Sequence, residues 1–205
     1  MTSIQLHKGD IPAGISFGSS VAVDTETLGL SLVRDKLCVV QLSAGDGSAH
    51  LVQLDRKTYD CPNLKTLLAD TSVQKIFHFA RFDLAMIKKW LDVDCGPVFC
   101  TKIASKLVRT YTDRHGLKEV SRELAGVDMS KAQQSSDWGA DTLSEAQLAY
   151  AASDVLHLHK IRDELTHMLE REARYHLAQA CFDFLPHRAA LDLAGWDEVD
   201  IFAHA

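Results

Sequence analysis

The stretch VAVDTETLGL, residues 21–30, decides the fold prediction because it places two carboxylates at the end of an apolar run. The first three residues are typical of a buried strand, whose interior disfavours Asp. Residues two apart in a strand point to the same face, so Asp24 and Glu26 are predicted to lie side by side and to repel each other. A positive charge between them would offset this repulsion. The stretch therefore predicts a cation site at the end of a strand.

The composition is that of an ordinary globular protein, with 46% hydrophobic and 24% charged residues among 205. This length suits a single domain over residues 1–205, with a C-terminal helical extension over 174–205 and no accessory nucleic-acid-binding domain. The net charge of −6 disfavours a surface that coats long nucleic acid by charge alone. A local basic pocket stays compatible with it.

The five cysteines form no CxxC pair and are odd in number, which favours a reducing compartment over a disulfide framework. The first residues, MTSIQLHKGDIP, lack the apolar core of a signal peptide, and no run reaches membrane-spanning length. We therefore expect a cytoplasmic protein that does not bind membranes.

Strand signals dominate the first half of the chain and helix signals the second. Strands are expected over 20–26, 36–43, 50–54, 73–79 and 97–100, and helices over 63–69, 81–91, 101–110, 116–126, 143–173 and 174–185. Residues 128–141 are polar and are expected to form a loop. The pattern predicts an α/β fold with a mixed central sheet flanked by helices.

Two further acidic residues extend the constellation begun by Asp24 and Glu26. Asp83 ends HFARFD, directly after an expected strand, and Asp154 ends YAASD on an expected helix, one turn after Tyr150. Each of these motifs alone is more often structural than catalytic, but their order and spacing together favour a shared site. Oxygen ligands of this kind suit Mg²⁺ or Mn²⁺. Two such ions would clamp the attacking and the leaving oxygen when a phosphodiester is cleaved.

The three acidic motifs resemble, in this order, those of the DEDD superfamily of 3′→5′ exonucleases, in its Tyr-containing branch. HGLKEVSREL, KAQQSSDW and LSEAQLAYAASDVLHLHKI extend the resemblance to ribonuclease D, from about residue 20 to about residue 165. GADTLS departs from it, because that family often has an Arg-Pro pair at this point. DTETLGL, FCTKIASKLVRTYTDRHGLKE and DLAGWDEVDIFAHA are most similar to nano-RNase C, a family of short enzymes that degrade dinucleotides.

The resemblance implies a ribonuclease H-like fold and a two-metal exoribonuclease that releases nucleoside 5′-monophosphates. It implies that four carboxylates hold two divalent ions, Mg²⁺ or Mn²⁺: Asp24, Glu26, Asp83 and Asp154. Tyr150 would orient the attacking water. Short RNA would be the substrate, and the resemblance implies a homo-oligomer in the form of an octameric ring.

Substrate-binding candidates lie beside these motifs, and each has a structural alternative. Leu30 would wedge between two bases, as in related enzymes, or would only begin a core contact after a turn. Gly29 would allow close approach of the backbone. Arg81 would contact a phosphate or pair with a nearby acid. The flanking Thr25 and His78 complete this group, although a His that ends a strand is more often simply packed.

The basic stretch 106–118, which contains Arg114 and His115, is a candidate phosphate-binding rim or else a solvated helix surface or subunit contact. A polar loop precedes the last motif and would bind substrate or position the helix; it contains Gln134, Ser135, Ser136 and Trp138. Trp138 would stack on a base or anchor the core.

Three functions compete with a dinucleotide-specific exoribonuclease. The first is a general 3′→5′ exonuclease on longer RNA or single-stranded DNA, which the net negative charge disfavours. The second is a non-catalytic RNA-binding module, which the complete set of four acids and one Tyr disfavours. The third is a metal-dependent phosphatase, which the order of the motifs disfavours.

Overall fold

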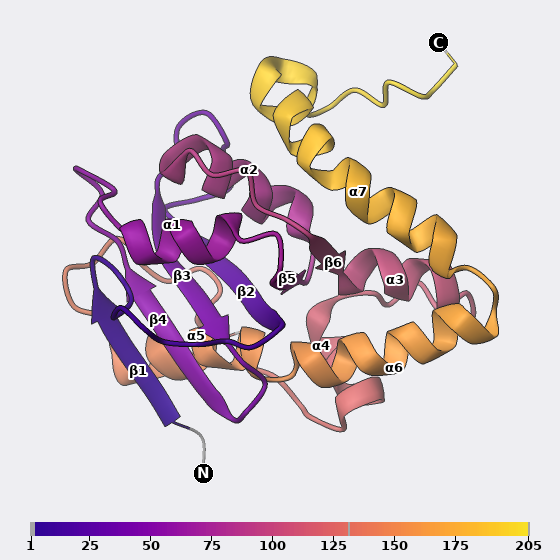
Figure 1. Cartoon of the computed structure of the whole chain (residues 1–205), viewed down its shortest axis with the longest axis horizontal. Helices are drawn as coiled ribbons and strands as arrows, with labels where there is room; N and C mark the ends of the chain where they lie inside the picture. Colours follow the sequence, from indigo (N-terminus) through magenta and orange to yellow (C-terminus); the bar gives the residue numbers. More distant parts are fainter. Residues whose placement is uncertain (1–2, 131, 205) are drawn as a thin grey trace.

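The computed structural model describes residues 3–130 and 132–204, and six strands in these residues form one mixed sheet (Figure 1). The strands are β1 (Ser3–Lys8), β2 (Ser20–Thr27), β3 (Leu37–Ser43), β4 (Ser48–Gln53), β5 (Gln74–Phe77) and β6 (Val98–Cys100). Their order across the sheet is β1-β4-β3-β2-β5-β6. β1 pairs parallel with β4, and β5 pairs parallel with both β2 and β6, whereas β3 is antiparallel to both of its neighbours. The prediction of a mixed central sheet flanked by helices is confirmed.

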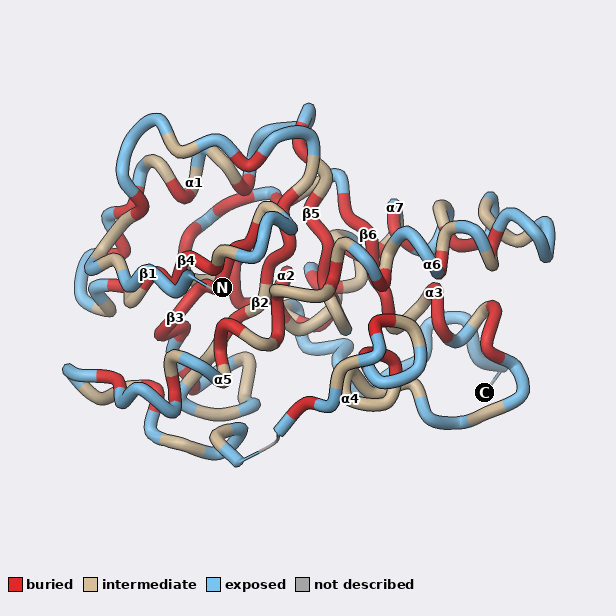
Figure 2. Tube along the Cα trace, turned by 90° about the horizontal axis from the view of Figure 1, so that it is seen from below, coloured by how far each residue is buried: buried red, intermediate tan, exposed pale blue. Residues whose placement is uncertain are grey.

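Helices cover both faces of the sheet, because the central strands are apolar on both sides. All seven residues of β3 are buried, which is typical of a strand covered on both faces. Val40 and Leu42 belong to the main core cluster, whereas Val39 belongs to a second cluster with Trp138 and Leu143. Figure 2 shows α1 (Pro62–Ala69) and α5 (Glu145–Leu156) on opposite sides of the strands.

The remaining helices follow the strands in the order that the sequence suggests. They are α2 (Ala80–Leu91), α3 (Thr101–Val108), α4 (Leu117–Val120), α6 (Leu158–Arg171) and α7 (Tyr175–Leu191), with π-helical turns η1 (Ser121–Ala125) and η2 (Asp192–Trp196). Ser144 caps α5 through a capping box with Gln147.

Two expected elements differ from the structure, and one strand was not expected. The single helix over 143–173 is wrong: α5 and α6 are separate helices that meet at His157, whose ψ of −3° interrupts the helical path. The strand over 73–79 ends at Phe77, because Phe79 is left-handed and begins α2. β1 was missed, because it forms only by parallel pairing with β4, more than forty residues away in the sequence.

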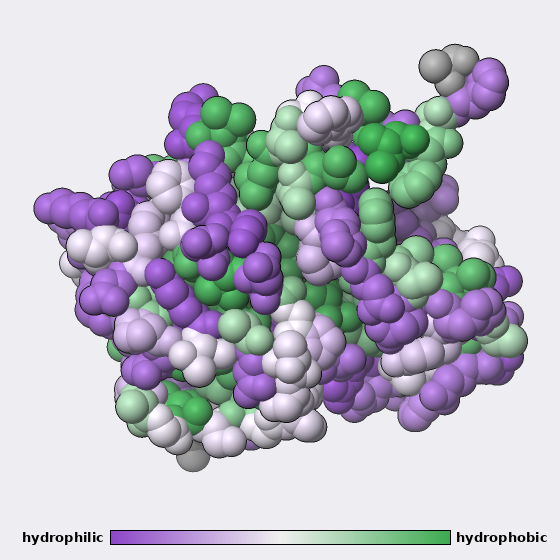
Figure 3. All heavy atoms as spheres, turned by 45° about the horizontal axis from the view of Figure 1, so that its top comes forward, coloured by the Kyte–Doolittle hydropathy of each residue, from purple (hydrophilic) through white to green (hydrophobic). Residues whose placement is uncertain are grey.

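The C-terminal segment packs on α2 through α7 and η2. A buried carboxylate joins them: Asp192 accepts from Arg81 at 2.6 Å and pairs with Arg188 at 2.8 Å. Beyond it, apolar side chains gather beside the C-terminal end of the chain, near the top of Figure 3. The exposed ones are Trp196, Val199, Ile201 and Phe202. Among the described residues, no helix is both long and apolar enough to span a membrane.

Candidate active site

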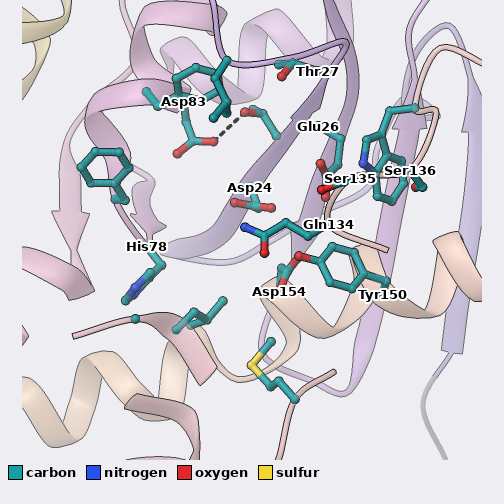
Figure 4. A pocket seen from close by; sticks show the side chains of 18 of the residues that line it. Asp24, Glu26, Thr27, His78, Asp83, Gln134, Ser135, Ser136, Tyr150 and Asp154 are labelled. Carbon is teal, nitrogen blue, oxygen red and sulfur yellow. Dashed lines mark hydrogen bonds between the residues drawn. The ribbon is translucent and has the colours of Figure 1, made fainter. Parts of the chain in front are cut away.

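Three carboxylates from two elements converge on one cavity of about 820 Å³. Asp24 and Glu26 lie on β2 and Asp154 on α5, and one oxygen of each lies within 4.8 Å of the other two (Figure 4). The strand register explains the first two: Asp24 pairs with Gln41 and Glu26 with Val39, on the face that α5 covers. A β-bulge follows Glu26, and bulges re-aim side chains beside active sites. This donor set of carboxylate oxygens fits Mg²⁺ or Mn²⁺.

Asp83 reaches the same cavity from the opposite face of the sheet. Thr25, between the two acids of β2, alternates to that face and donates from Oγ1 to Asp83 Oδ1 at 2.6 Å (Figure 4). Asp83 is buried in the first turn of α2. This hydrogen bond from Thr25 therefore holds the second acidic motif against the first. Thr25 also lines the cavity.

The clustered carboxylates raise one another's pKa. Burial raises the pKa of Asp24 to about 7 and, together with the charge of Asp24, that of Asp154 to about 8. Burial and the charges of Asp24, Asp154 and Asp83 raise the pKa of Glu26 to about 10. Burial and the charge of Asp24 place the pKa of Asp83 well above its usual range. A cluster with these pKa values needs bound cations to be fully ionised at neutral pH.

This electrostatic repulsion predicts an unusual pH dependence of stability. A carboxyl group whose pKa is higher in the folded than in the unfolded chain, where it is about 4, favours the fold at low pH and disfavours it once ionised. In EDTA, Tm is therefore expected to fall as the pH rises from about 5 to 8, and Mg²⁺ should restore it at pH 8. Scanning calorimetry with and without Mg²⁺ tests this. A flat Tm in EDTA, or no effect of Mg²⁺ at pH 8, would contradict it.

Tyr150 stands one turn before Asp154, as its spacing predicts. Burial, followed by the charges of Asp154, Glu26 and Asp24, raises the pKa of Tyr150 above its usual range, so its hydroxyl stays protonated. Its ring packs against Trp138, with the centroids 6.1 Å apart. Trp138 is only 2% exposed and belongs to the second core cluster. Trp138 also lines the cavity. Its low exposure supports the core anchor among its two predicted roles.

His78 lies across the cavity from Tyr150 (Figure 4). Thr101 Oγ1 donates to the carbonyl of Phe77 at 3.0 Å, so His78 Nδ1 must donate to Thr101 Oγ1, at 2.8 Å. Burial lowers the pKa of His78 to about 3, which keeps the ring neutral. Its Nε2 is a buried acceptor without a partner among the described residues. His78 thus offers a hydrogen-bond acceptor, rather than a positive charge, to the cavity.

The loop after β2 carries Gly29 and Leu30 along the rim of the cavity. Leu30 is 84% exposed, so it is no core contact in this chain. A Cβ on Gly29 would meet Asp35 Oδ2 at 2.4 Å. Asp35 accepts from the backbone of Ser31 at 2.9 Å and so shapes this loop. The absence of a side chain at Gly29 therefore makes room for Asp35 in this loop.

The other predicted residues divide between the cavity and its surroundings. Gln134, Ser135 and Ser136 line it. Arg81 does not: it forms a two-point ion pair with Asp192, which is the acid-pairing alternative. Arg114 and His115 also lie outside the lining, and His115 Nδ1 contacts Ser105 Oγ at 2.9 Å.

Among the described residues, the basic side chains that line the cavity are Lys102 and Lys118, and the apolar ones beyond the predictions include Phe79, Phe82 and Met129. Lys118 belongs to the predicted basic stretch 106–118. Sequence patterns gave no signal for Phe79, whose position depends on a left-handed backbone.

A mixed sheet whose second strand and flanking helices deliver four carboxylates and a tyrosine to one cavity defines a DEDD-type, metal-dependent nuclease domain. Residues 12–170 match the family described as 3′-5′ exonuclease. The chain belongs to this 3′-5′ exonuclease family.

Individual relatives agree with this family. Ribonuclease D of Gluconacetobacter diazotrophicus is 38% identical over 75% of this chain, although the chain spans only 39% of that protein's length. The structure of Brucella melitensis NrnC is 56% identical, covers 99% of both chains and superposes with a TM-score of 0.96. The same protein has been solved with bound Mg²⁺ (55% identical, 100% of both chains, TM-score 0.95) and bound to pGG (55%, 100% of both, TM-score 0.97).

Proposed function

We propose that this protein is a divalent-metal-dependent 3′→5′ exoribonuclease that hydrolyses very short RNA, chiefly dinucleotides, to nucleoside 5′-monophosphates. The observation that carries the proposal is the convergence of Asp24, Glu26 and Asp154 within 4.8 Å, beside Asp83 and Tyr150, in a cavity with an apolar rim. The similarity over the full chain to a nuclease solved with pGG supports the preference for short substrates.

The cavity is lined by both carboxylates and lysines, which would bind different parts of the substrate. The scissile phosphate would lie at the carboxylates, held through cations, and Lys102 and Lys118 would attract the negative charge of the remaining nucleotide. His78 Nε2 would accept a hydrogen bond from a ribose hydroxyl. Leu30 would separate the two bases from the rim.

Each group of the chain has a distinct part in the reaction. Two divalent ions, held by Asp24, Glu26, Asp83 and Asp154, would supply Lewis-acid stabilisation of the phosphate charge and lower the pKa of a bound water. Tyr150, protonated at neutral pH, would donate from its hydroxyl and orient the attacking water toward the phosphorus. Thr25 would keep Asp83 in place relative to β2. Attack displaces the 3′-oxygen of the upstream nucleotide and releases a nucleoside 5′-monophosphate.

Substrate length tests this proposal most directly. Initial rates would be measured with Mg²⁺ or Mn²⁺ on 5′-labelled RNAs of two, seven and twenty nucleotides, with the Asp24→Asn variant as the blank. We expect the dinucleotide to be cleaved at least about tenfold faster than the longer RNAs, because the chain is similar over its full length to a protein solved with the short ligand pGG. Stepwise shortening of the twenty-mer at an equal or higher rate would replace the proposal by a general 3′→5′ exonuclease.

The proposal includes a cellular compartment and an oligomeric state for the protein. All five cysteines are free, which supports a reducing compartment such as the cytoplasm. The exposed apolar side chains near the C-terminal end support self-association, for which the octameric ring implied by the resemblance is the proposed form.

A further inference from the structure

We infer that Phe79 is a base-stacking platform that determines how tightly the substrate is held, an inference that rests on the proposed nuclease function. Phe79 is the N-cap residue of α2 and lines the cavity four residues before Asp83. It lies between His78 and Asp83 in HFARFD, and the sequence pattern alone assigns it no role.

The backbone of Phe79 is held in a conformation that its side chain disfavours. Its φ of 74° and ψ of 45° lie in the left-handed region, which bulky residues rarely adopt. Glycine or asparagine would satisfy the same turn without strain. Strained residues of this kind persist where the surrounding structure and function require the side chain.

The ring of Phe79 is also unusually exposed. Its exposed fraction is 45%, whereas Trp138 is 2% exposed. Among the described aromatic residues that line the cavity, Phe79 is therefore the exposed one, because Phe82 and Tyr150 are half-buried. A large aromatic ring left open on the wall of a substrate cavity gains burial only when a ligand covers it.

The surroundings of the ring fit a nucleotide. Lys102 Nζ lies 4.1 Å from the ring centroid, which is cation–π distance, and Lys102 also lines the cavity. A stacking surface beside a positive charge is the combination with which proteins hold single-stranded nucleic acid. Because α2 carries both Phe79 and Asp83, the platform has a fixed position relative to the acidic site.

The test compares Phe79→Gly, Phe79→Leu and Phe79→Tyr in the full-length protein with Mg²⁺. Phe79→Gly removes the ring and the backbone strain together, so we expect unchanged Tm or a small increase, unchanged kcat and a KM raised about 5- to 100-fold, the range for loss of one stacked base. Phe79→Leu should resemble the Gly variant in KM, and Phe79→Tyr should resemble the wild type.

A matched control lies at the other end of the same helix. Asp92 is also left-handed, with φ of 53°, and is the C-cap residue of α2, outside the cavity. Asp92→Gly relieves strain without touching the substrate, so its KM should equal that of the wild type. Lys102→Met should raise KM at low salt, and this increase should become smaller at high salt because salt screens the charge. The increase caused by Phe79→Gly should persist at high salt.

Stacking itself is read out with dinucleotides that carry 2-aminopurine at one position or the other. Binding to the wild type should quench the fluorescence of one of them, and Phe79→Gly should remove that quenching. An unchanged KM in Phe79→Gly, or quenching that survives in it, would overturn the inference. So would wild-type KM in Phe79→Leu, which would mean that apolar bulk suffices.

The same variants are measured on RNAs of two and of seven nucleotides. If the wild type prefers the longer RNA, the dinucleotide preference fails, while the effect of Phe79→Gly on that RNA still decides the role of the ring. A KM that rises for Phe79→Gly and Phe79→Leu, but not for Phe79→Tyr or Asp92→Gly, supports the platform in either case.

Discussion

Replacing Asp24 by asparagine is expected to lower turnover by about 10³-fold or more, with little loss of fold stability. An oxygen of Asp24 lies within 4.8 Å of one from each other member of the cluster, and its charge raises the pKa of Glu26 and Asp154. Its loss weakens the binding of divalent cations, which supply several kcal/mol of transition-state stabilisation, and each 1.4 kcal/mol corresponds to about tenfold in rate. The measurement is kcat on a dinucleotide at saturating Mg²⁺.

Stability separates this loss from misfolding. Asparagine keeps the shape of the side chain and removes one of the mutually repelling charges, so in EDTA at pH 8 the variant should be as stable as the wild type or more stable. Calorimetry at that pH is the control. Turnover within tenfold of the wild type would exclude Asp24 as a metal ligand, and a lower Tm would show that the carboxylate has a structural role.

Replacing Tyr150 by phenylalanine is expected to lower kcat by about 10²-fold or more, with KM changed much less. The hydroxyl is the only group removed, and misplacing a reacting group by about 1 Å can cost about 10²-fold. The ring would keep its contact with Trp138, so the fold should survive. Single-turnover rates with the dinucleotide measure the chemical step directly.

The pH profile distinguishes two roles of Tyr150. Burial and neighbouring carboxylates hold its pKa above the usual range, so the wild type should show no tyrosine-dependent loss of rate up to about pH 9. An orienting donor therefore predicts that the variant is slower by the same factor at every pH. A factor that shrinks steadily with rising pH would instead assign the hydroxyl a part in proton transfer to or from the substrate.

The acidic residues could be predicted from the sequence because strand and helix periodicity are local. Asp24 and Glu26 needed only the two-residue alternation of a strand, and Tyr150 and Asp154 only one turn of helix. The interruption at His157 could not be predicted, since no proline or glycine marks it.

Other features depended on partners far away in the sequence. Arg81 could have bound a phosphate or an acid, and the choice is made by Asp192, which lies 111 residues further along the chain. The sequence allowed Trp138 either to stack on a base or to anchor the core, and its place in the second core cluster is a property of the fold. Phe79 carried no pattern, because its exposure and its positive φ are properties of the folded backbone.

The distribution of the acidic cluster along the chain also sets the order in which it can be assembled during synthesis. Asp24 and Glu26 belong to the second strand, whereas Asp154 follows roughly 130 residues later. At about 5 to 20 residues per second, a ribosome needs about 7 to 26 seconds to cover that distance. The nascent β2–β3–β4 hairpins can therefore form before the helix that carries Asp154 is complete. Asp154 joins the repelling charges of β2 only when most of the chain exists, so the cluster of carboxylates stays incomplete in an unfinished chain.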